Sequence, residues 1–318
     1  MKIFITGGNG FTGSHLVKTL ENQGHTIKCL VRKTSDLSRL NQSNVELIYG
    51  EITDSEIINK AMEDIDIVFH LAAYVELGLV NAVEMARVNV EGTRTILEIA
   101  KTKSISKMIY CSTIGIYGNS FGEIINETFQ RQQKNFSSAY DRTKYEAQQL
   151  VNEFVAAGLP VVSMMPSGIF GVDDPHFGPV IKLFLQRKLK FWVGGDRITG
   201  IVHVDDLVTA MILAMEKSPP GEHYIISAGE LKTREMFAFL SQETGISTPL
   251  ELPEIVVRII ANILDLIGRT LNWNPPLSNE RVHYLYDRCV RVDSTKAQQQ
   301  LGWQPRSVYE TLRSLLST

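Results

Sequence analysis

The sequence lacks the features that define several other classes of protein. It has no run of about 18 uncharged apolar residues, so we expect no membrane-spanning helix. Lysine and arginine number 32 against 35 acidic residues, and this balance argues against a nucleic-acid-binding protein, whose surface is basic. Because the first apolar run is short and ends in glycine, we also expect no secretory signal peptide.

Cysteine and closely spaced histidine are also scarce. The three cysteines, Cys29, Cys111 and Cys289, are an odd number, and their spacing suits no metal site. Cys29 and Cys111 fall in apolar, strand-like runs, so we interpret them as reduced thiols in the core of a cytoplasmic protein. The seven histidines show no His-x-x-x-His spacing, and we expect no metal.

The first two-thirds of the chain alternate strand-like and helix-like segments. Continuous apolar strands between amphipathic helices are typical of a parallel sheet covered on both faces, so the predicted fold class is α/β. The alternation loosens after about residue 170, where proline and glycine recur before a helical C-terminal segment. The expected strands are 2–6, 26–32, 45–49, 66–72, 107–113 and 160–166, and the expected helices are 12–22, 55–62, 82–103 and 138–157.

Glycine is concentrated between the first expected strand and the first expected helix, at Gly7, Gly8, Gly10 and Gly13. The backbone amides of such a turn, together with the helix N-terminus, bind a pyrophosphate when no Cβ intrudes. At the head of a βαβ series, this pattern predicts a dinucleotide-binding loop. The alternative is a glycine-rich turn without a ligand.

The spacing Thr-Gly-x-x-Gly-x-x-Gly resembles the fingerprint of the extended short-chain dehydrogenase/reductase superfamily, the NAD(P)-dependent epimerases and dehydratases. Other stretches agree with this superfamily, in order, along nearly the whole chain: His70-Leu71-Ala72-Ala73, Asn89-Val90-Glu91-Gly92-Thr93, Cys111-Ser112-Thr113 leading to Tyr117-Gly118, Tyr140-x-x-x-Lys144, Pro166-Ser167-Gly168-Ile169-Phe170-Gly171, His203-Val204-Asp205-Asp206, and Lys296-Ala297 before Leu301-Gly302-Trp303. On this ordered set the chain is identified as a member of the superfamily.

The resemblance implies a Rossmann fold, a doubly wound parallel sheet, with a smaller and mostly helical C-terminal substrate domain. The Rossmann domain would span residues 1–170, and the chain would return to it around 198–228. The substrate-binding part would comprise 171–197 and 229–318. The resemblance also implies a homodimer through the helices 82–103 and 138–157, and a structural turn rather than a metal site at His203.

The end of the second strand bears on the nicotinamide cofactor, because it meets the adenosine ribose. Arg32 and Lys33 stand there, and a guanidinium pairs with the 2′-phosphate of NADP(H) at two points. We therefore favour NADP(H). Two alternatives stay open: Asp36 as a ribose ligand, which would suit NAD(H), and Arg32 with Lys33 as a solvated pair without a ligand.

The resemblance assigns further residues to the cofactor. In it, Asp54 contacts the adenine, Asn89 reaches the cofactor from the long helix, and the turn at Pro166 backs the nicotinamide amide. The full expected set is Gly7, Gly10, Phe11, Thr12, Gly13, Arg32, Lys33, Ile52, Asp54, Leu71, Ala72, Ala73, Asn89, Ser112, Tyr140, Lys144, Pro166, Ser167 and Gly168.

Tyr140 and Lys144 are four residues apart, so they share one face of the expected helix. A nearby ammonium and an oxidised nicotinamide lower the pKa of a phenol, and we expect this effect on Tyr140. In the resemblance, Tyr140 exchanges a proton with the substrate oxygen and Lys144 also holds the cofactor ribose. The resemblance also implies that Thr113, rather than Ser112, hydrogen-bonds that oxygen where charge builds. It further implies that hydride moves between the nicotinamide and a substrate carbon.

The neighbouring residues bear on the reaction. Sugar-nucleotide dehydratases of this superfamily place Asp-Glu directly after the catalytic threonine, whereas this chain has Ile114 and Gly115, which argues against dehydration. Sugar-nucleotide enzymes often carry arginine before the proline at the end of the sixth strand, and here Met165 stands there. Residues 31–37 and the region around Pro275 most resemble the dihydroflavonol 4-reductase-like branch, which includes 3β-hydroxysteroid dehydrogenase-like proteins and so-called hopanoid-associated sugar epimerases.

The leading hypothesis is therefore reduction of a ketone, or oxidation of a secondary alcohol, on a largely apolar small molecule. Two alternatives stay open. One is NAD(P)-dependent epimerisation of a sugar nucleotide, which needs only transient oxidation. The other is a regulator that binds NADP without chemistry, against which the intact Thr113, Tyr140 and Lys144 argue.

The segment 253–272 is strongly amphipathic. Its apolar helical face carries Val256, Ile259, Ile260, Ile263 and Ile267, and its polar face carries Arg258, Asn262, Asp265 and Arg269. The simplest interpretation packs the apolar face on the protein's own core. Two alternatives stay open: a lid over an apolar substrate, and a peripheral contact of residues 255–271 with a membrane surface.

Overall fold

Seven parallel strands form the central sheet of the computed structural model, which describes residues 1–317. The strands are β1 (Lys2–Thr6), β2 (Thr26–Val31), β3 (Glu46–Tyr49), β4 (Ile67–His70), β5 (Lys107–Cys111), β7 (Val161–Pro166) and β11 (His223–Ile226). Their order, β11-β7-β5-β4-β1-β2-β3, changes direction between β1 and β4. Open α/β sheets bind ligands at such a switch point, outside the carboxyl ends of the strands.

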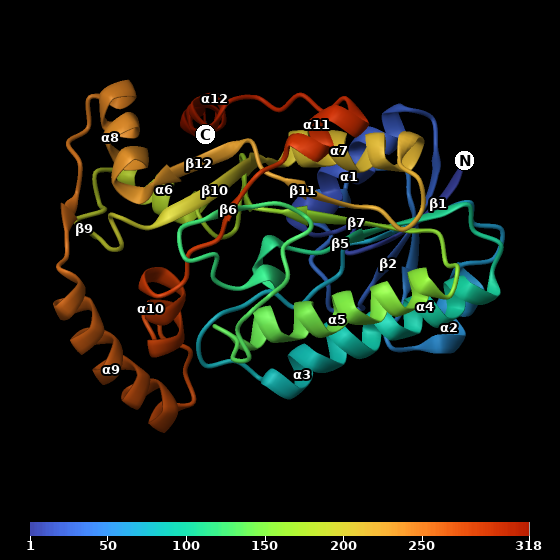
Figure 1. Cartoon of the computed structure of the whole chain (residues 1–318), viewed down its shortest axis with the longest axis horizontal. Helices are drawn as coiled ribbons and strands as arrows, with labels where there is room; N and C mark the ends of the chain where they lie inside the picture. Colours follow the sequence, from blue (N-terminus) through green and yellow to red (C-terminus); the bar gives the residue numbers. More distant parts are fainter. Residues whose placement is uncertain (318) are drawn as a thin grey trace.

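Helices cover both faces of this sheet (Figure 1). One face carries α1 (Phe11–Asn22), α7 (Val204–Lys217) and α11 (Thr295–Leu301), and the other carries α2 (Ser55–Ala61), α3 (Ala82–Ala86), α4 (Gly92–Thr102) and α5 (Ala139–Ala156). The predicted fold, a doubly wound parallel sheet of the Rossmann type, is confirmed.

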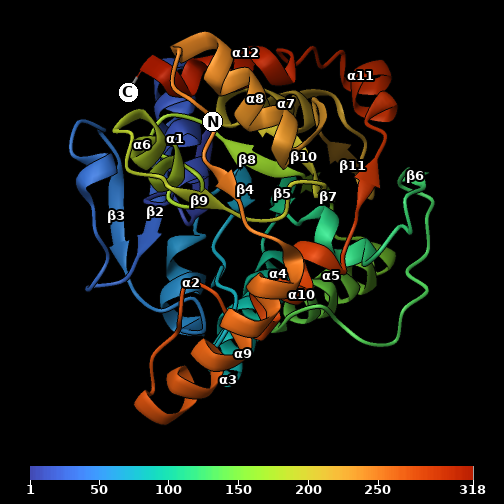
Figure 2. The same ribbon diagram turned by 90° about the vertical axis from the view of Figure 1, so that its left-hand side faces the viewer.

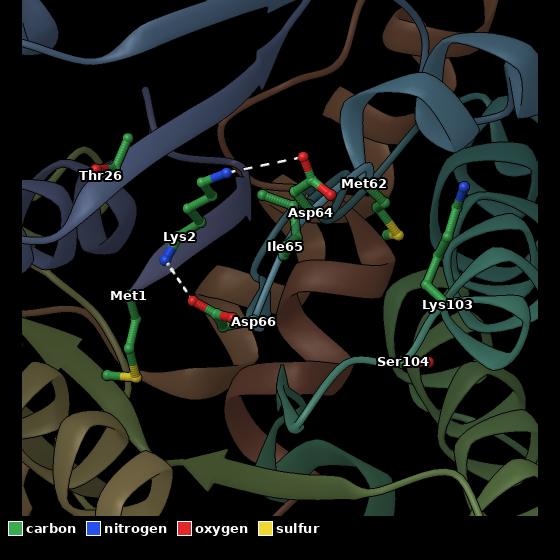
Figure 3. Close-up of a pocket in the computed structure, with 9 residues that line it drawn as sticks. All are labelled: Met1, Lys2, Thr26, Met62, Asp64, Ile65, Asp66, Lys103 and Ser104. Atoms are coloured by element: carbon green, nitrogen blue, oxygen red, sulfur yellow. Dashed lines mark hydrogen bonds and ion pairs between the residues drawn. The ribbon is translucent and has the colours of Figure 1, made fainter.

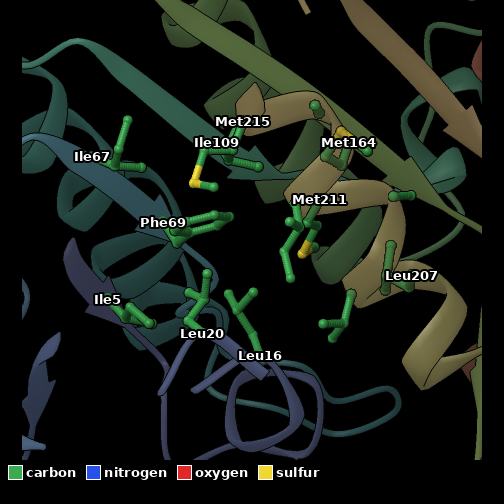
Figure 4. Packing of buried hydrophobic residues seen from close by; sticks show 14 of the residues in the cluster. Ile5, Leu16, Leu20, Ile67, Phe69, Ile109, Met164, Leu207, Met211 and Met215 are labelled. Atoms are coloured by element: carbon green, nitrogen blue, oxygen red, sulfur yellow. The ribbon is translucent and has the colours of Figure 1, made fainter. Parts of the chain in front are cut away.

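The main core lies between the sheet and the helices α1 and α7. Figure 4 shows Leu16 and Leu20 of α1 close to Phe69 of β4. Met211 and Met215 of α7 belong to the same cluster, on the same face of the sheet. All five side chains are at most 5% exposed. Because helices cover the strands on both sides, the strands are apolar along their length rather than alternating, which is the pattern that the sequence displays.

The expected helix 82–103 is interrupted by a π turn. The chain runs from α3 through the π turn η2 (Arg87–Glu91) into α4. The π turn places Asn89 inside the protein, where it is 2% exposed. Single π turns inside helices are frequent at functional sites, and the extra residue that they insert leaves no clear periodic trace in the sequence.

Beyond β7 the chain builds a second lobe from small sheets and helices, which lies at one end of the molecule in Figure 1 and toward the viewer in Figure 2. Its three-stranded sheet pairs β10 (Ile198–His203) in parallel with β8 (Gly168–Phe170) and antiparallel with β12 (Gly229–Lys232). Two further pairs are β9 (Phe191–Trp192) with β13 (Leu250–Glu251), and β14 (Arg291–Val292) with β6 (Ile124–Ile125), a strand that precedes β7 in the chain. The helices are α6 (Gly178–Leu185), α8 (Thr233–Thr244), α9 (Glu254–Leu271), α10 (Asn279–Tyr286) and α12 (Val308–Ser314).

The interpretation that the apolar face of α9 packs on the core is wrong. Ile259 is 55% exposed and Leu266 is 66% exposed, whereas the buried side of the helix consists of Val257, Ala261, Asp265 and Gly268. Asp265, expected on the polar surface, is only 5% exposed and accepts a 2.7 Å hydrogen bond from Arg269. Within residues 1–317, no helix has both the length and the apolar character to span a bilayer.

Candidate active site

The turn between β1 and α1 exposes backbone rather than side chains. Gly7 has a φ of +75°, and a Cβ there would lie 2.7 Å from the backbone nitrogen of Ala72. A Cβ at Gly13 would overlap the carbonyl oxygen of Gly7. The Gly10 N–H closes the turn with a 3.0 Å hydrogen bond to that same carbonyl. Because α1 begins at Phe11 without a side-chain cap, the N–H groups of its first turn are available to an anion.

A buried chain of hydrogen bonds ties this turn to the neighbouring strand. The Ala72 N–H donates to Oγ1 of Thr6 at 3.2 Å, and that hydroxyl lies 2.7 Å from Nδ1 of His70. Nε2 of His70 lies 2.9 Å from Oγ1 of Thr93, whose hydroxyl donates to the carbonyl of Asn89. Because the Thr93 proton is used on that carbonyl, the network assigns the imidazole hydrogen to Nε2, and Nδ1 accepts from Thr6.

Asn89 continues the chain to the helix that bears Tyr140. Its Oδ1 accepts from the Tyr74 N–H at 2.7 Å, and its Nδ2 donates to the Tyr74 carbonyl and to Oγ1 of Thr143. Thr143 in turn donates to the carbonyl of Tyr140. The side-chain amide of Asn89 is therefore engaged by its own chain, and the cofactor contact expected of it stays a prediction.

α5 brings Lys144 to the carboxyl end of β5. Ser138 caps α5 by accepting from a first-turn N–H, so Tyr140 lies in the first turn and Lys144 one turn further on. The Lys144 side chain is buried, and its ammonium donates to Oη of Tyr110 at 3.0 Å and to the Cys111 carbonyl at 2.8 Å. These two bonds use two of the three N–H groups of the ammonium.

The pKa of Tyr140 is raised, and the expected lowering does not come from the chain's own residues. Burial raises this pKa well above the ordinary value of a phenol, and Cys111 and Tyr284 raise it further. Lys144 does not offset the burial, because its ammonium is directed to Tyr110 and Cys111. The phenol is therefore protonated at neutral pH, which is the state of a proton donor.

Three hydroxyls lie at the carboxyl ends of β5 and β7. Oγ1 of Thr113 accepts from the Gly115 N–H at 3.1 Å and caps the short helix η3 (Ile114–Tyr117). The buried hydroxyls of Ser112 and Ser167 have no hydrogen-bond partner within residues 1–317. A buried polar group without a partner costs free energy, so these two hydroxyls fit a polar ligand at the strand ends.

The residues that follow β2 divide into two groups. Arg32 and Lys33 are exposed immediately after the strand. The carboxylate of Asp36 instead accepts from both the N–H and the hydroxyl of Ser38, and these hydrogen bonds lower its pKa. Asp36 is therefore engaged in its own loop, while the two cations are directed to solvent.

The residues expected near the adenine hold the adjacent elements in place. Asp54 caps α2, with Oδ1 accepting from the Ile57 N–H at 3.1 Å. Ile52 is buried and fills the space beside Gly92, at the start of α4. The adenine contact of Asp54 stays a prediction, as do the roles of the other expected cofactor residues.

Sequence reasoning missed a cluster of arginine and tyrosine that the second lobe places against Tyr140. Two guanidinium groups lie over the ring of Tyr284: the central carbons of Arg197 and Arg288 are 4.9 Å and 4.3 Å from its centre. Arg288 forms a buried ion pair with Asp141 at 3.1 Å, directly next to Tyr140. Asp141 stands inside a recognised motif, but no spacing pattern in the sequence connects it with the two arginines.

Gly115 lies where this ion pair meets η3. A Cβ at Gly115 would be 2.9 Å from Nη2 of Arg288 and would overlap the carboxylate of Asp141. The ion pair therefore occupies the space that a glutamate at this position would need. The structure thus gives a physical reason why the chain cannot carry a dehydratase-type acid at residue 115.

His203 lies in a capping turn. Its Nδ1 accepts from the Asp205 N–H at the start of α7, and the Asp205 carboxylate lies 2.7 Å from Nδ1 of His15. Asp206 pairs with Arg306 at 3.0 Å. Within the described part of the chain, no three His, Cys, Asp or Glu side chains are grouped so that they could hold a metal ion.

A separate hollow lies at the opposite, amino-terminal edge of the sheet (Figure 3). Lys2 and Asp66 line it, and the Lys2 N–H donates to the Asp66 carboxylate at 2.7 Å. Since open α/β sheets bind their ligands at the carboxyl ends of the strands, this hollow is not the candidate active site.

The fold, the glycine turn and the tyrosine–lysine pair together define a dinucleotide-binding enzyme of the Rossmann class. The chain belongs to the NAD dependent epimerase/dehydratase family, whose profile matches residues 3–227. It is an NAD(P)-dependent enzyme of the extended short-chain dehydrogenase/reductase type.

Named relatives match most of the chain. The 4-hydroxy-2-methyl-3-oxo-4-farnesyl-3,4-dihydroquinoline-1-oxide ketoreductase of Stigmatella aurantiaca is 29% identical over 98% of this chain and 94% of its own length. A 3-beta-hydroxysteroid dehydrogenase of Mycolicibacterium neoaurum is 28% identical over 80% of this chain and 72% of its own length. The crystal structure of gox2253 superposes with a TM-score of 0.84 at 29% identity, covering 99% of this chain and 96% of that one.

The first prediction concerns the buried imidazole. Burial, with a smaller effect of Lys144, lowers the pKa of His70 from 6.5 to about 3. Between these values the unfolded chain binds a proton that the folded chain does not, so stability should be lost as the pH falls below 6.5. The contribution of this one group is at most about 1.4 kcal/mol per pH unit.

In His70→Gln this contribution should be absent. Urea unfolding at about pH 7 and about pH 5 should therefore give the variant a shallower dependence of the free energy of unfolding on pH than the wild type shows. His176→Gln, at an exposed position, is the control and should keep the wild-type dependence. Equal dependences in all three proteins would contradict a neutral buried His70.

The second prediction concerns the space beside Gly115. Gly115→Ala should lower the free energy of unfolding by about 1–3 kcal/mol, because the added methyl must displace the Asp141–Arg288 ion pair. The control is Gly178→Ala, where the nearest atom to the new Cβ is 3.8 Å away. If chemical unfolding finds both variants as stable as the wild type, the close packing at residue 115 is refuted.

Proposed function

We propose that the protein is an NADP(H)-dependent oxidoreductase that reduces a ketone, or oxidises a secondary alcohol, on a largely apolar small molecule. One observation carries this proposal: a partly buried Tyr140, kept protonated by desolvation, lies one helical turn from Lys144 and close to the strand end that bears Thr113. A protonated phenol is able to complete the reduction of a carbonyl group by giving its proton to the oxygen.

The residues of the site divide the work of this reaction. When bound, the cofactor supplies the hydride that reaches the carbonyl carbon. The Thr113 hydroxyl donates to the substrate oxygen and holds it in place, while Tyr140 transfers its phenolic proton to that oxygen. Two of the three N–H groups of Lys144 are held by Tyr110 and Cys111, and the third is proposed to hold the cofactor ribose. In the opposite direction, the same groups accept the proton from an alcohol.

The cofactor is proposed to lie along the carboxyl ends of the strands. The bare turn at Gly7 and Gly13 suits a pyrophosphate, and the unpartnered hydroxyls of Ser112 and Ser167 suit polar groups near the nicotinamide. Arg32 is exposed at the end of β2, which supports recognition of a 2′-phosphate and hence NADP(H) over NAD(H).

An apolar substrate is supported by the names of the relatives. One relative is a ketoreductase named for a farnesylated quinoline, and another is named for a hydroxysteroid. The buried Met165 agrees with them, because it stands where sugar-nucleotide enzymes often carry an arginine. We also propose that residues 171–197 and 229–318 bind this substrate, and that the protein is a cytoplasmic homodimer that uses α3, α4 and α5.

Epimerisation of a sugar nucleotide is the second candidate. The stacking of Arg197 and Arg288 on Tyr284 favours it, because guanidinium groups pair well with the oxygens of a diphosphate. Arg288 is already neutralised by Asp141, so this recognition would depend mainly on Arg197. An epimerase returns its hydride, so it consumes no NADPH, whereas a reductase oxidises one NADPH for each ketone reduced. Incubation with a UDP-sugar and, separately, with a hydrophobic ketone, followed at the NADPH absorbance, distinguishes the two.

The third prediction tests the proton donor. Tyr140→Phe removes the phenolic proton and little volume, so turnover of a hydrophobic ketone should fall by at least about a hundredfold. Binding of NADPH, followed by its fluorescence, should stay near the wild-type level. Turnover by the phenylalanine variant at the wild-type rate would remove Tyr140 from the mechanism, and the proposed function with it.

The fourth prediction tests the choice of cofactor. Arg32→Gln should weaken NADPH binding by about tenfold or more, because it removes a charge-assisted contact, and it should leave NADH binding nearly unchanged. The control is Arg313→Gln, because Arg313 is an exposed arginine that pairs with Glu243, and this variant should leave both affinities unchanged. Equal NADPH and NADH affinities in the wild-type protein would contradict the proposal that Arg32 binds the 2′-phosphate of NADP(H).

A further inference from the structure

The helix α9 exposes its most apolar side to solvent. Nineteen large hydrophobic side chains are exposed in residues 1–317, and eight of them fall between residues 255 and 273. We call these eight the α9 face: Ile255, Val256, Ile259, Ile263, Leu266, Ile267, Leu271 and Trp273. Contiguous exposed apolar surface of this kind marks an interaction site rather than ordinary protein surface.

The α9 face points away from the protein. At about 100° per residue, its helical members spread over roughly half of the circumference of α9. They lie opposite Val257, Ala261 and Gly268, which form the side that is buried on the protein. Figures 1 and 2 both show α9 at the outer edge of the molecule, where α10 runs beside it. The rest of the protein therefore covers only one side of this helix.

No charge interrupts the α9 face. The four charged residues of α9 occupy a narrow arc at its edge, and they neutralise one another in pairs. Arg258 pairs with Glu254 at 2.7 Å, and Arg269 pairs with Asp265 at the same distance. The helix itself thus carries no net charge, and its apolar arc meets a polar edge along its length.

The size of the α9 face decides between two occupants. A helix of 18 residues is roughly 27 Å long and 10 Å wide. Two copies in contact through this strip alone would each bury roughly 270 Å², about a third of the 800 Å² that a stable interface needs. A lipid surface imposes no such minimum, because an amphipathic helix binds by inserting its apolar face while its polar edge stays among the headgroups. Trp273, just past the helix end, is suited to the boundary between the lipid headgroups and the acyl chains, because its ring is apolar and its N–H is polar.

We propose that the α9 face docks the protein on the surface of a lipid bilayer, with α9 lying in the plane of the interface. The paired charges of α9 give no net attraction to anionic lipid, so apolar insertion supplies the binding. Zwitterionic vesicles should therefore suffice, and added salt should have little effect. The proposal stands on this helix and not on the proposed chemistry, since membrane binding requires no turnover.

The test is flotation of the purified full-length protein with phosphatidylcholine vesicles, at low and high salt, with and without phosphatidylglycerol. The wild type should float with the vesicles in all conditions. In Ile259→Gln/Leu266→Gln, the partition coefficient onto the vesicles should fall by about tenfold or more, because two large apolar side chains are lost from the inserted face. Phe121→Gln/Ile124→Gln replaces two apolar residues of similar exposure, 69% and 61%, and should float like the wild type.

Three results would overturn the proposal. One is failure of the folded wild type to float with either kind of vesicle. Another is equal flotation of the wild type and Ile259→Gln/Leu266→Gln. The third is analytical ultracentrifugation in which the wild type is a dimer and this variant a monomer, because the α9 face would then join two copies of the chain. Circular dichroism shows whether each variant is folded, and turnover of a water-soluble ketone by the variant reports separately on the chemistry.

Discussion

The structure depends on a neutral imidazole held between two hydroxyl groups in the middle of the fold. His70 links Thr6, at the end of the first strand, to Thr93, which passes the connection to the backbone of Asn89. Asn89 reaches Thr143 and, through it, the carbonyl of Tyr140. A single line of buried hydrogen bonds therefore connects the glycine turn with the helix that carries the candidate acid, and burial makes each of its members costly to unpair.

The same burial determines the chemical character of the site. Desolvation holds Tyr140 in its protonated form, while the ammonium of Lys144 is fixed on the end of β5. Beside Tyr140, Arg288 pairs with Asp141 and lies over the ring of Tyr284, together with Arg197. The site thus combines a rigid floor, made by the parallel sheet, with a cover contributed by residues far along the chain. Such a division lets one scaffold keep its hydride chemistry while the cover varies with the substrate.

The features of the fold and the site that could be predicted from the sequence each have a local physical cause. The glycine turn and the pair Tyr140 and Lys144 follow from backbone sterics and helical spacing, and the parallel sheet follows from its uninterrupted apolar strands. Features created only by tertiary structure left no such trace. Arg288 meets Asp141 across nearly half of the chain, and the pKa of Tyr140 depends on burial by distant residues. Periodicity revealed that α9 has an apolar side, but it does not specify what covers that side.

The pairing of β14 with β6 has a consequence for the order in which the protein forms. The Ser120 N–H donates to the Cys289 carbonyl, next to the arginine that neutralises Asp141, so a segment in the first half of the chain is completed by one that is synthesised much later. The first six strands of the sheet, β1 to β7, can assemble on the nascent chain well before this closure, since domains form from the N-terminus as they emerge. The strands whose ends form the candidate site are therefore in place first. The ion pair beside Gly115 forms only after Arg288 has been synthesised and reaches Asp141.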